Sequence, residues 1–318
     1  MQQQVQADDD VAEPSKEAGN SILGTHTPES FEQKTRPSGS LPPGLHLAMQ
    51  PIMSMNAPTA LFNFEVLLRI LAPDRSLQAA EDVIATAEQS GDTAAIDTWT
   101  MTTVLEWFRK HRASLTNTRF ICVGLFGSSI NNEHFLKETL SLFERFQDIV
   151  PYLCLQIDVS VTLNNLASIQ HFISRVHRMG GKIALDNFGS GHSSFEHVRH
   201  LSADVLKIDG ELVRDMSAQP TDIAVVDAII MLARNLGMSS IASGVENVHT
   251  LRALTELGVG YVQGSLVARP QEAMAIVGAS SITSFVEDPA MTKFIQDMSS
   301  AEQHSTPTHR PLDKAQLH

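Results

Sequence analysis

The sequence predicts an α/β protein built as a closed (β/α)8 barrel of the TIM type. Three observations lead to this prediction: eight short apolar runs typical of buried strands, amphipathic stretches between most of these runs, and Gly residues at the ends of two amphipathic stretches, where helices stop. Repeated strand-then-helix order implies a parallel sheet, and eight strand-helix units are the number that closes into a barrel.

The eight expected strands follow one another along residues 45–264. They are LHLAMQPI at 45–52, ALFNFEVLLRIL at 60–71, RFICVGL at 119–125, YLCLQID at 152–158, KIALDNF at 182–188, VLKID at 205–209, SIASGV at 240–245 and YVQG at 261–264. The helical stretches include AAEDVIATAEQSG, LNNLASIQHFISRVHRMGG and TDIAVVDAIIMLARNLG. In the last of these, the spacing of Met231, Leu232 and Leu236 predicts packing against the core.

The connection between the first two strands, MSMNAPT, is too short for a crossover helix. We therefore expect an antiparallel hairpin at the start of the barrel. In this arrangement the second strand is the antiparallel one, with Glu65 in its middle and facing the barrel interior.

The two ends of the chain differ in composition from the part between them. Residues 1–43 are polar and poor in apolar side chains, which predicts a disordered arm. The folded domain is expected over 44–278. An extension over 279–318 follows, with a short helix around 282–298 and a disordered tail from about 300.

Composition excludes several classes of protein. A formal net charge of −13 argues against a general nucleic-acid surface. We expect a cytoplasmic protein without membrane insertion, since no apolar run is long enough to span a bilayer and the acidic start does not resemble a signal peptide. Cys122 and Cys154 lie in strand-like runs and are expected to be buried thiols.

Chemistry in such barrels lies at the carboxyl ends of the strands. The polar residues at or near these ends are Gln50, Glu65, Gln156, Asp158, Asp186, Asn187, Lys207, Asp209, Ser243, Glu246 and Gln263. An unpaired buried polar group costs several kcal/mol, so this cluster predicts either a self-satisfied network or a ligand site. Periodicity alone does not choose between the two.

Seven ordered segments resemble the EAL domain over about 44–276. They are AMQPI, FEVLLR, LQID, ALDNFGSGHSSF, VLKIDGELV, IASGVEN and YVQGSLVARP. This family is a (β/α) barrel known as a cyclic-di-GMP phosphodiesterase and, in degenerate members, as a cyclic-di-GMP receptor or protein-binding module. The signature here is EVL in place of EAL, a variation associated with receptor-type members that do not hydrolyse the nucleotide.

The resemblance implies a catalytic centre of two divalent cations that activate a water. It assigns Glu65, Asp186 and Lys207 as remnants of that centre. At the other positions of that centre the expected ligands are replaced, and the residues found here are Gly124, Gln156, Val159, Asn187 and Ser243. Neutral or absent oxygens hold Mg²⁺ or Mn²⁺ poorly, so we expect no metal cofactor and no catalysis. Asp158, on the same side of its strand as Gln156, is the one candidate for partial compensation.

The resemblance also implies which residues contact nucleotide. They are Gln50, Glu65, Leu67, Arg69, Asp97, Asp186, Lys207, Gln263, Arg269 and Pro270. Arg69 offers a fork of donors to a phosphate, and Asp97 is placed to accept hydrogen bonds from a guanine edge. Structural roles are the alternatives: Lys207 neutralised by Asp186 or Asp209, Glu65 paired with Arg69, and Asp97 bridging helices.

Three functions follow from this pattern. The first is a metal-independent cyclic-di-GMP receptor that changes a contact with a protein partner. The second is an interaction module that binds neither nucleotide nor metal, and the third is a phosphodiesterase with unusual ligands. A homodimer is compatible with each of them.

Overall fold

The computed structural model describes residues 41, 44–74, 76–162, 166–190, 198–216 and 219–304. The expected disordered arm and most of the tail lie outside these ranges. The strands are β1 Leu45–Ser54, β2 Asn63–Leu71, β3 Leu77–Ala79, β4 Ile121–Leu125, β5 Leu153–Asp158, β6 Lys182–Phe188, β7 Val205–Ile208, β8 Ser239–Ala242, β9 Tyr261–Val262 and β10 Gln271–Glu272. They form one sheet, in which β1 pairs with both β9 and β2 and so closes the barrel. The predicted fold is therefore confirmed, and each of the eight expected strands is present.

The direction of the first two strands differs from the prediction. β1 and β2 form the expected antiparallel hairpin, but β2 runs parallel to β4, whereas β1 is antiparallel to both β2 and β9. The antiparallel strand of the barrel is thus the first and not the second. A short turn fixes only the relative direction of the strands it joins, so the sequence could not show which of them follows the remaining strands.

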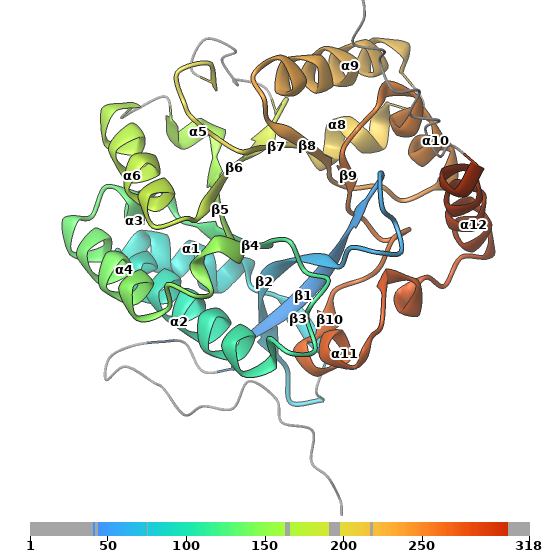
Figure 1. The fold of residues 1–318 in the computed structure, drawn as a ribbon. Helices are drawn as coiled ribbons and strands as arrows, with labels where there is room; N and C mark the ends of the chain where they lie inside the picture. Colours follow the sequence, from blue (N-terminus) through green and yellow to red (C-terminus); the bar gives the residue numbers. More distant parts are fainter. Residues whose placement is uncertain are drawn as a thin grey trace, which may run out of the picture.

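Helices surround the barrel on its outer side (Figure 1). They are α1 Glu81–Ser90, α2 Thr93–His111, α3 Gly127–Ile130, α4 Glu133–Arg145, α5 Val159–Thr162, α6 Leu166–Arg178, α8 Gly210–Asp215, α9 Pro220–Asn235, α10 Val248–Leu257, α11 Ala273–Gly278 and α12 Pro289–His304, with short 3₁₀ turns η1 Val150–Tyr152 and η2 Ile282–Phe285. None of the described helices combines the length and apolar character needed to cross a membrane.

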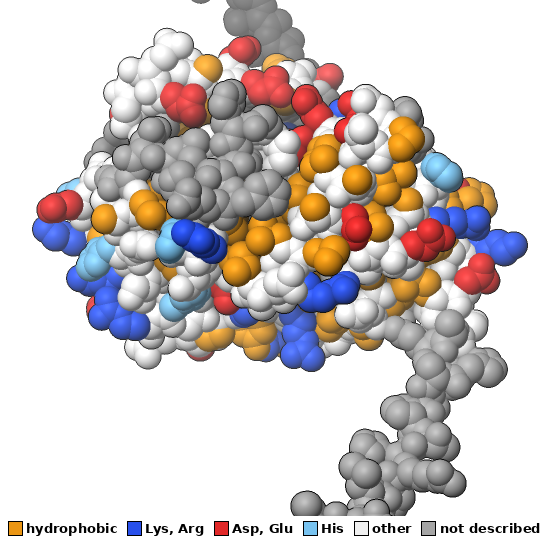
Figure 2. Space-filling view, turned by 90° about the horizontal axis from the view of Figure 1, so that it is seen from above, with side chains coloured by type: hydrophobic (Ala, Val, Ile, Leu, Met, Phe, Trp, Pro, Cys, Tyr) orange, Lys and Arg blue, Asp and Glu red, His pale blue; other side chains and the backbone are white. Residues whose placement is uncertain are grey.

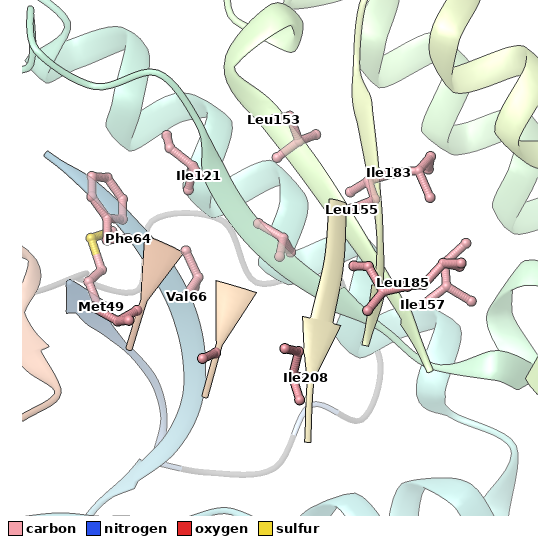
Figure 3. Close-up of a cluster of buried hydrophobic side chains, with 14 of the residues drawn as sticks. Met49, Phe64, Val66, Ile121, Leu153, Leu155, Ile157, Ile183, Leu185 and Ile208 are labelled. Carbon is pink, nitrogen blue, oxygen red and sulfur yellow. The ribbon is translucent and has the colours of Figure 1, made fainter. Parts of the chain in front are cut away.

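Alternation along each strand divides the barrel into two apolar regions. Outward side chains such as Phe64, Leu155 and Ile208 are fully buried and belong to the main hydrophobic core (Figure 3). Inward side chains at the end of the barrel where the parallel strands begin and the antiparallel β1 finishes form a separate plug, made of Ile52, Phe120, Cys122, Cys154, Ala184, Val205 and Ile241. Both cysteines are free and buried in this plug. The plug closes the lower part of the barrel, so any site must lie above it.

The segment after residue 278 belongs to the folded domain. Ile282, Met291 and Ile295 are almost fully buried, and the ring of Phe285 lies 5.9 Å from that of Phe62, just before β2. The expected short helix around 282–298 is instead a 3₁₀ turn followed by α12, which extends to His304. Pro289 marks the change, because proline fits the first turn of a helix better than its interior.

α9 departs from the predicted packing. Val226, Ile229, Ile230 and Ala233 face the core, but Met231 is 52% exposed and Leu236 is 37% exposed. The prediction that these two residues pack in the core is wrong. Apolar side chains occur around the whole circumference of this helix, so periodicity did not identify its buried side.

Candidate functional site

A layer of polar side chains lies directly above the apolar plug. Gln50 and Glu65 are directly opposite each other in the β1–β2 pair, and both point into the barrel. Gly124 is the register partner of Gln156, and Asp158 is the register partner of Asp186. Because inward positions alternate along each strand, Lys207, Ser243 and Gln263 complete the layer. The barrel thus brings most of the predicted strand-end residues to one place.

Glu65 is the centre of this layer. Its Oε1 accepts a hydrogen bond from Lys207 Nζ at 2.7 Å, and its Oε2 accepts one from Gln263 Nε2 at 2.5 Å. The same Gln263 amide lies 3.1 Å from Gln50 Oε1, and Gln50 Nε2 donates to the carbonyl of Ala268 at 3.0 Å. Both carboxylate oxygens are therefore engaged within the protein. Among the described ion pairs Glu65 pairs with Lys207, so the alternative pair with Arg69 is not formed.

The charges of this layer are coupled. Burial raises the pKa of Glu65, but the Lys207 charge and hydrogen bonds outweigh burial and leave it below its usual value. Burial lowers the pKa of Lys207, but Glu65 and Asp186 together raise it above its usual value. Glu65 is thus a carboxylate and Lys207 an ammonium ion at neutral pH, an internal neutral pair.

Asp186 and Asp158 lie at the rim of the barrel and also have internal partners. Asp186 Oδ2 is 3.5 Å from Lys207 Nζ, and its Oδ1 accepts from the backbone N–H of Asn187. Burial raises the pKa of Asp186, and the nearby charge of Glu65 adds to this effect while Lys207 opposes it. Asp158 Oδ1 accepts from Ser160, and its Oδ2 accepts from Asn187 Nδ2 at 2.6 Å. Both carboxylate oxygens of Asp158 therefore already accept hydrogen bonds within the protein.

Asn187 adopts a left-handed conformation, with φ of 57°. Asparagine tolerates this region better than most residues, because its short polar side chain can bond locally. Here the side chain is turned onto Asp158. The amide therefore supplies a donor at the position where the family resemblance expects a second carboxylate.

The remaining substituted positions do not favour a cation. Gly124 has no side chain, Val159 is buried at the start of α5, and Gln156 is buried with an amide. Within the described part of the chain, no cluster of three or more His, Cys, Asp or Glu residues could hold a metal ion. The amides of Gln156 and Asn187 and the hydroxyl of Ser243 carry no charge, and the carboxylates that remain already have partners, Glu65 and Asp186 with Lys207 and Asp158 with Ser160 and Asn187, so this set does not fit the hard cations expected from the family resemblance.

Three buried polar atoms in this layer have no hydrogen-bond partner among the described residues. They are Gln156 Nε2, Ser243 Oγ and Gln263 Oε1. The Gln156 side chain faces Glu65 and helps to lower its pKa, although its Nε2 forms none of the hydrogen bonds described above. The sequence marked these positions as substituted, but it could not show that their polar atoms lack partners.

Arg69 and Leu67 are on the same face of β2 as Glu65, nearer the carboxyl end of the strand. Both are half-buried. Arg69 Nη1 donates to the carbonyl of Leu68 at 2.8 Å, which uses one donor of the guanidinium group. Arg69 therefore lies at the rim of the barrel, and its aliphatic side-chain carbons are on the same face of β2 as the polar layer.

Three other predicted contacts lie outside the polar layer. Asp97 is buried in α2, where its Oδ2 accepts from the backbone N–H of Phe126 at 3.0 Å, before α3. Burial raises the pKa of Asp97 to about 7, despite hydrogen bonds from Ser129 and Phe126. Arg269 is exposed and lines a pocket of about 160 Å³ with Glu246 and Phe285, and Pro270 follows it. Asp97 thus bridges helices, as the structural alternative predicts.

The chain is similar to several curated proteins. It is 30% identical over 225 residues to the cyclic di-GMP phosphodiesterase PdeF of Escherichia coli strain K12, covering 71% of this chain and 30% of that protein. It is 29% identical over 227 residues to the cyclic di-GMP phosphodiesterase PdeB of Shewanella oneidensis, covering 71% of this chain and 26% of that protein. The chain therefore spans less than a third of the length of these relatives.

Solved structures share the fold. A phosphodiesterase described as PaMucR in complex with c-di-GMP has a TM-score of 0.65 at 28% identity, covering 73% of this chain and 94% of that one. The FimX EAL domain of Pseudomonas aeruginosa bound to c-di-GMP has a TM-score of 0.63 at 23% identity, with 73% and 92% covered. The model of the EAL domain matches residues 43–270, and the chain belongs to this family.

Proposed function

We propose that this chain binds cyclic-di-GMP at the mouth of the barrel without a metal ion and without hydrolysing it. The observation that carries the proposal is the state of Glu65, whose two oxygens are taken by Lys207 and Gln263. A carboxylate that already neutralises a buried ammonium ion is a poor ligand for a second cation. The Lys207 ammonium group already occupies the place beside this carboxylate that a cation would take.

The loss of hydrolysis follows from the same residues. A metal-bound water is nucleophilic because the metal lowers its pKa by several units, and each unit corresponds to about 1.4 kcal/mol. Gly124, Gln156, Asn187 and Ser243 offer no charged oxygen to hold such a metal. Relatives named as phosphodiesterases set the class of ligand, and these substitutions argue against turnover in this chain.

Binding is supported by the residues retained at the rim. Arg69 and Leu67 lie above Glu65 on one strand face, and Arg69 keeps further donors beyond the one that contacts Leu68. A guanidinium group recognises phosphate through two parallel hydrogen bonds. Two solved relatives are described as bound to c-di-GMP, which names the nucleotide to be tested.

Isothermal titration with cyclic-di-GMP, with and without EDTA, tests this function. We expect the same binding heat in both conditions and a loss of at least tenfold in affinity for Arg69→Ala. Arg252→Ala, which removes an exposed arginine from α10, is the matched control and should bind as the wild type does. Absence of binding at high micromolar nucleotide, or binding abolished by EDTA, would contradict the proposal.

A second candidate function is protein interaction through the outer face of α9. Exposed on or next to this helix are Ile223, Val225, Met231 and Leu236, four of the five large hydrophobic side chains exposed in the described residues. Figure 2, the view onto the top of Figure 1 where α9 lies, shows hydrophobic side chains gathered there. Exposed apolar side chains concentrated on one element are a feature of interaction sites.

We assign this face to a second copy of the chain. Two copies that each carry a net charge of −13 repel, so contact is favoured where a surface exposes no acidic group, and the one charged side chain among the exposed residues of α9 is that of Arg234. Ala224 and Ala228 are exposed one helical turn apart, which allows a second helix to approach closely. A two-fold axis would place the same apolar face on both sides of the contact.

A further inference from the structure

The interior of the barrel contains donors without acceptors at the positions where the family resemblance implies cation ligands. Gln156 is 2% exposed, and its Nε2 has no hydrogen-bond partner among the described residues; the same holds for Ser243 Oγ. A buried donor that lacks an acceptor costs about 1–3 kcal/mol, so native proteins rarely retain one without a use. The Gln156 amide faces Glu65, but both oxygens of that carboxylate already accept from Lys207 and Gln263, so the two donors are available to an acceptor from outside the protein.

The space beside Gln156 is open. Gly124 is its register partner on β4, and a Cβ placed on Gly124 would have only Gln156 Oε1 within 4 Å, at 3.9 Å. Gly124 is also exposed, although the four other residues of β4 are buried. The missing side chain therefore leaves room for a ligand group next to the Gln156 amide.

Ser243 and Gln263 lie on the other side of the layer. They follow the paired residues Ala242 and Val262 of β8 and β9, so their side chains lie next to each other on the inner face. Gln263 donates to Glu65 and Gln50 through its amide nitrogen, which leaves its Oε1 without a donor. The unpaired atoms are thus two donors, on Gln156 and Ser243, and one acceptor, on Gln263.

Compared with the ligands that the family resemblance implies, the site has lost carboxylates as well as gained hydrogen-bond donors. With Glu65 neutralised by Lys207, Asp186 is the one other acidic group among the described residues that pairs with Lys207, at 3.5 Å from its Nζ. The positions at 156, 187 and 243 carry no charge. With Lys207 neutralised and Asp186 and Asp158 at the rim, it is the unpaired donors of Gln156 and Ser243, and not the net charge, that suit an anionic oxygen better than a cation.

We propose that the substituted positions form a direct anion site, in which Gln156 and Ser243 donate hydrogen bonds to the phosphoryl oxygens of the bound cyclic dinucleotide. The inference rests on the proposed function and adds the mode of binding. Each substitution that removes a cation ligand at 156 and 243 supplies a donor, so the phosphodiester contacts the protein itself. Gln263 Oε1 accepts from a hydroxyl or amine of the same ligand.

Titration calorimetry with cyclic-di-GMP in EDTA tests this inference, with Gln156→Glu as the main variant. This change keeps the shape of the side chain but replaces the donor by an anionic acceptor, so we expect affinity to fall at least tenfold. Ser243→Ala should weaken binding several-fold. Gln296→Glu, which adds the same charge on the exposed side of α12, is the control and should leave affinity unchanged.

The outcomes separate the inference from the function on which it rests. If the wild type and Gln156→Glu bind equally in EDTA, the inference is wrong although the receptor function stands. If the wild type does not bind at all, both fail. Thermal unfolding of each variant without ligand distinguishes lost contacts from a lost fold. A crystal structure of the complex with a metal ion between Gln156 and the phosphate would also overturn the inference.

Discussion

Lys207 Nζ lies 2.7 Å from Glu65 Oε1, and the two side chains are 6% and 10% exposed. Removing one partner of a buried pair leaves an uncompensated charge, which typically costs about 3–5 kcal/mol, whereas replacing both by apolar groups is often neutral. The pair therefore couples β2 to β7 across the barrel interior.

We expect Lys207→Met and Glu65→Leu each to lower the free energy of unfolding by about 3–5 kcal/mol. The double variant should be closer to the wild type than either single one. Urea unfolding of the four proteins at pH 7 provides the complete double-mutant cycle. Strictly additive effects would show that the two charges do not stabilise each other.

Restoring the substituted ligands should restore a cation site. A variant with Gly124→Asn, Gln156→Glu, Asn187→Asp and Ser243→Glu is expected to bind Mn²⁺, and to convert cyclic-di-GMP to the linear dinucleotide. The space beside Gly124 accommodates the first of these changes. Chromatographic separation of the nucleotides measures the product, with the wild type and Glu65→Ala as controls. Product from the wild type above the Glu65→Ala level would contradict the proposed loss of hydrolysis.

Asp97 should make stability fall with rising pH. Its pKa is raised from 3.8 to about 7 in the folded state, so the folded protein binds an additional proton between these values. Stability is then full below about pH 4 and decreases as pH rises to about 7, by about 4 kcal/mol at most. Asp97→Asn should remove this pH dependence, because an amide does not ionise. The Asn side-chain oxygen can still accept the hydrogen bond from the backbone N–H of Phe126. Urea unfolding at pH 5 and pH 8 measures the free energy of unfolding of both proteins. An equal change in this free energy between the two pH values for the wild type and Asp97→Asn would refute the assignment.

The outer face of α9 should control self-association. Met231→Glu introduces a charge at its centre and is expected to convert a dimer to a monomer, as measured by sedimentation velocity over a range of concentrations. Met274→Glu makes the same chemical change on α11, where Met274 is 36% exposed, and should have no effect. A wild-type protein that is monomeric at every concentration would exclude the second copy as the occupant of this face.

Gly264 should not tolerate a side chain. A Cβ at this position would lie 2.1 Å from the carbonyl oxygen of Val245 and 2.4 Å from its nitrogen, both of which are backbone atoms. We expect Gly264→Ala to destabilise the protein by about 3 kcal/mol and to displace the adjacent Gln263. Gly278→Ala, where no atom lies within 4 Å, is the control. Equal melting temperatures for the two variants would contradict the expected clash.

The barrel itself could be predicted from the sequence because each strand is a continuous apolar run bounded by turn residues. The inward direction of Glu65 also follows from alternation. In contrast, β3 and β10 have only three and two residues, and their pairing with β2 and β1 depends on the completed barrel. Runs this short contain no period that a sequence pattern could detect.

The partners of the site residues were less predictable. Lys207 could have been neutralised by Asp186 or Asp209, and the structure shows Glu65 as its nearest partner, with Asp186 at 3.5 Å. Asp209 instead accepts from the backbone of Glu211 and Leu212 at the start of α8. The distance between inward side chains on non-adjacent strands depends on barrel closure, which strand order alone does not specify.

The pairing of β1 with β9, the last strand of the barrel, has a consequence for biosynthesis. Met53 pairs with Val262, about 200 residues later in the chain, and this contact completes the ring. Contacts between such distant segments form slowly, because the intervening chain must first be ordered. During translation, β1 leaves the ribosome early but its β9 partner is made only after all the other barrel strands. Until then the nascent chain exposes an incomplete sheet, which is a natural binding surface for a chaperone.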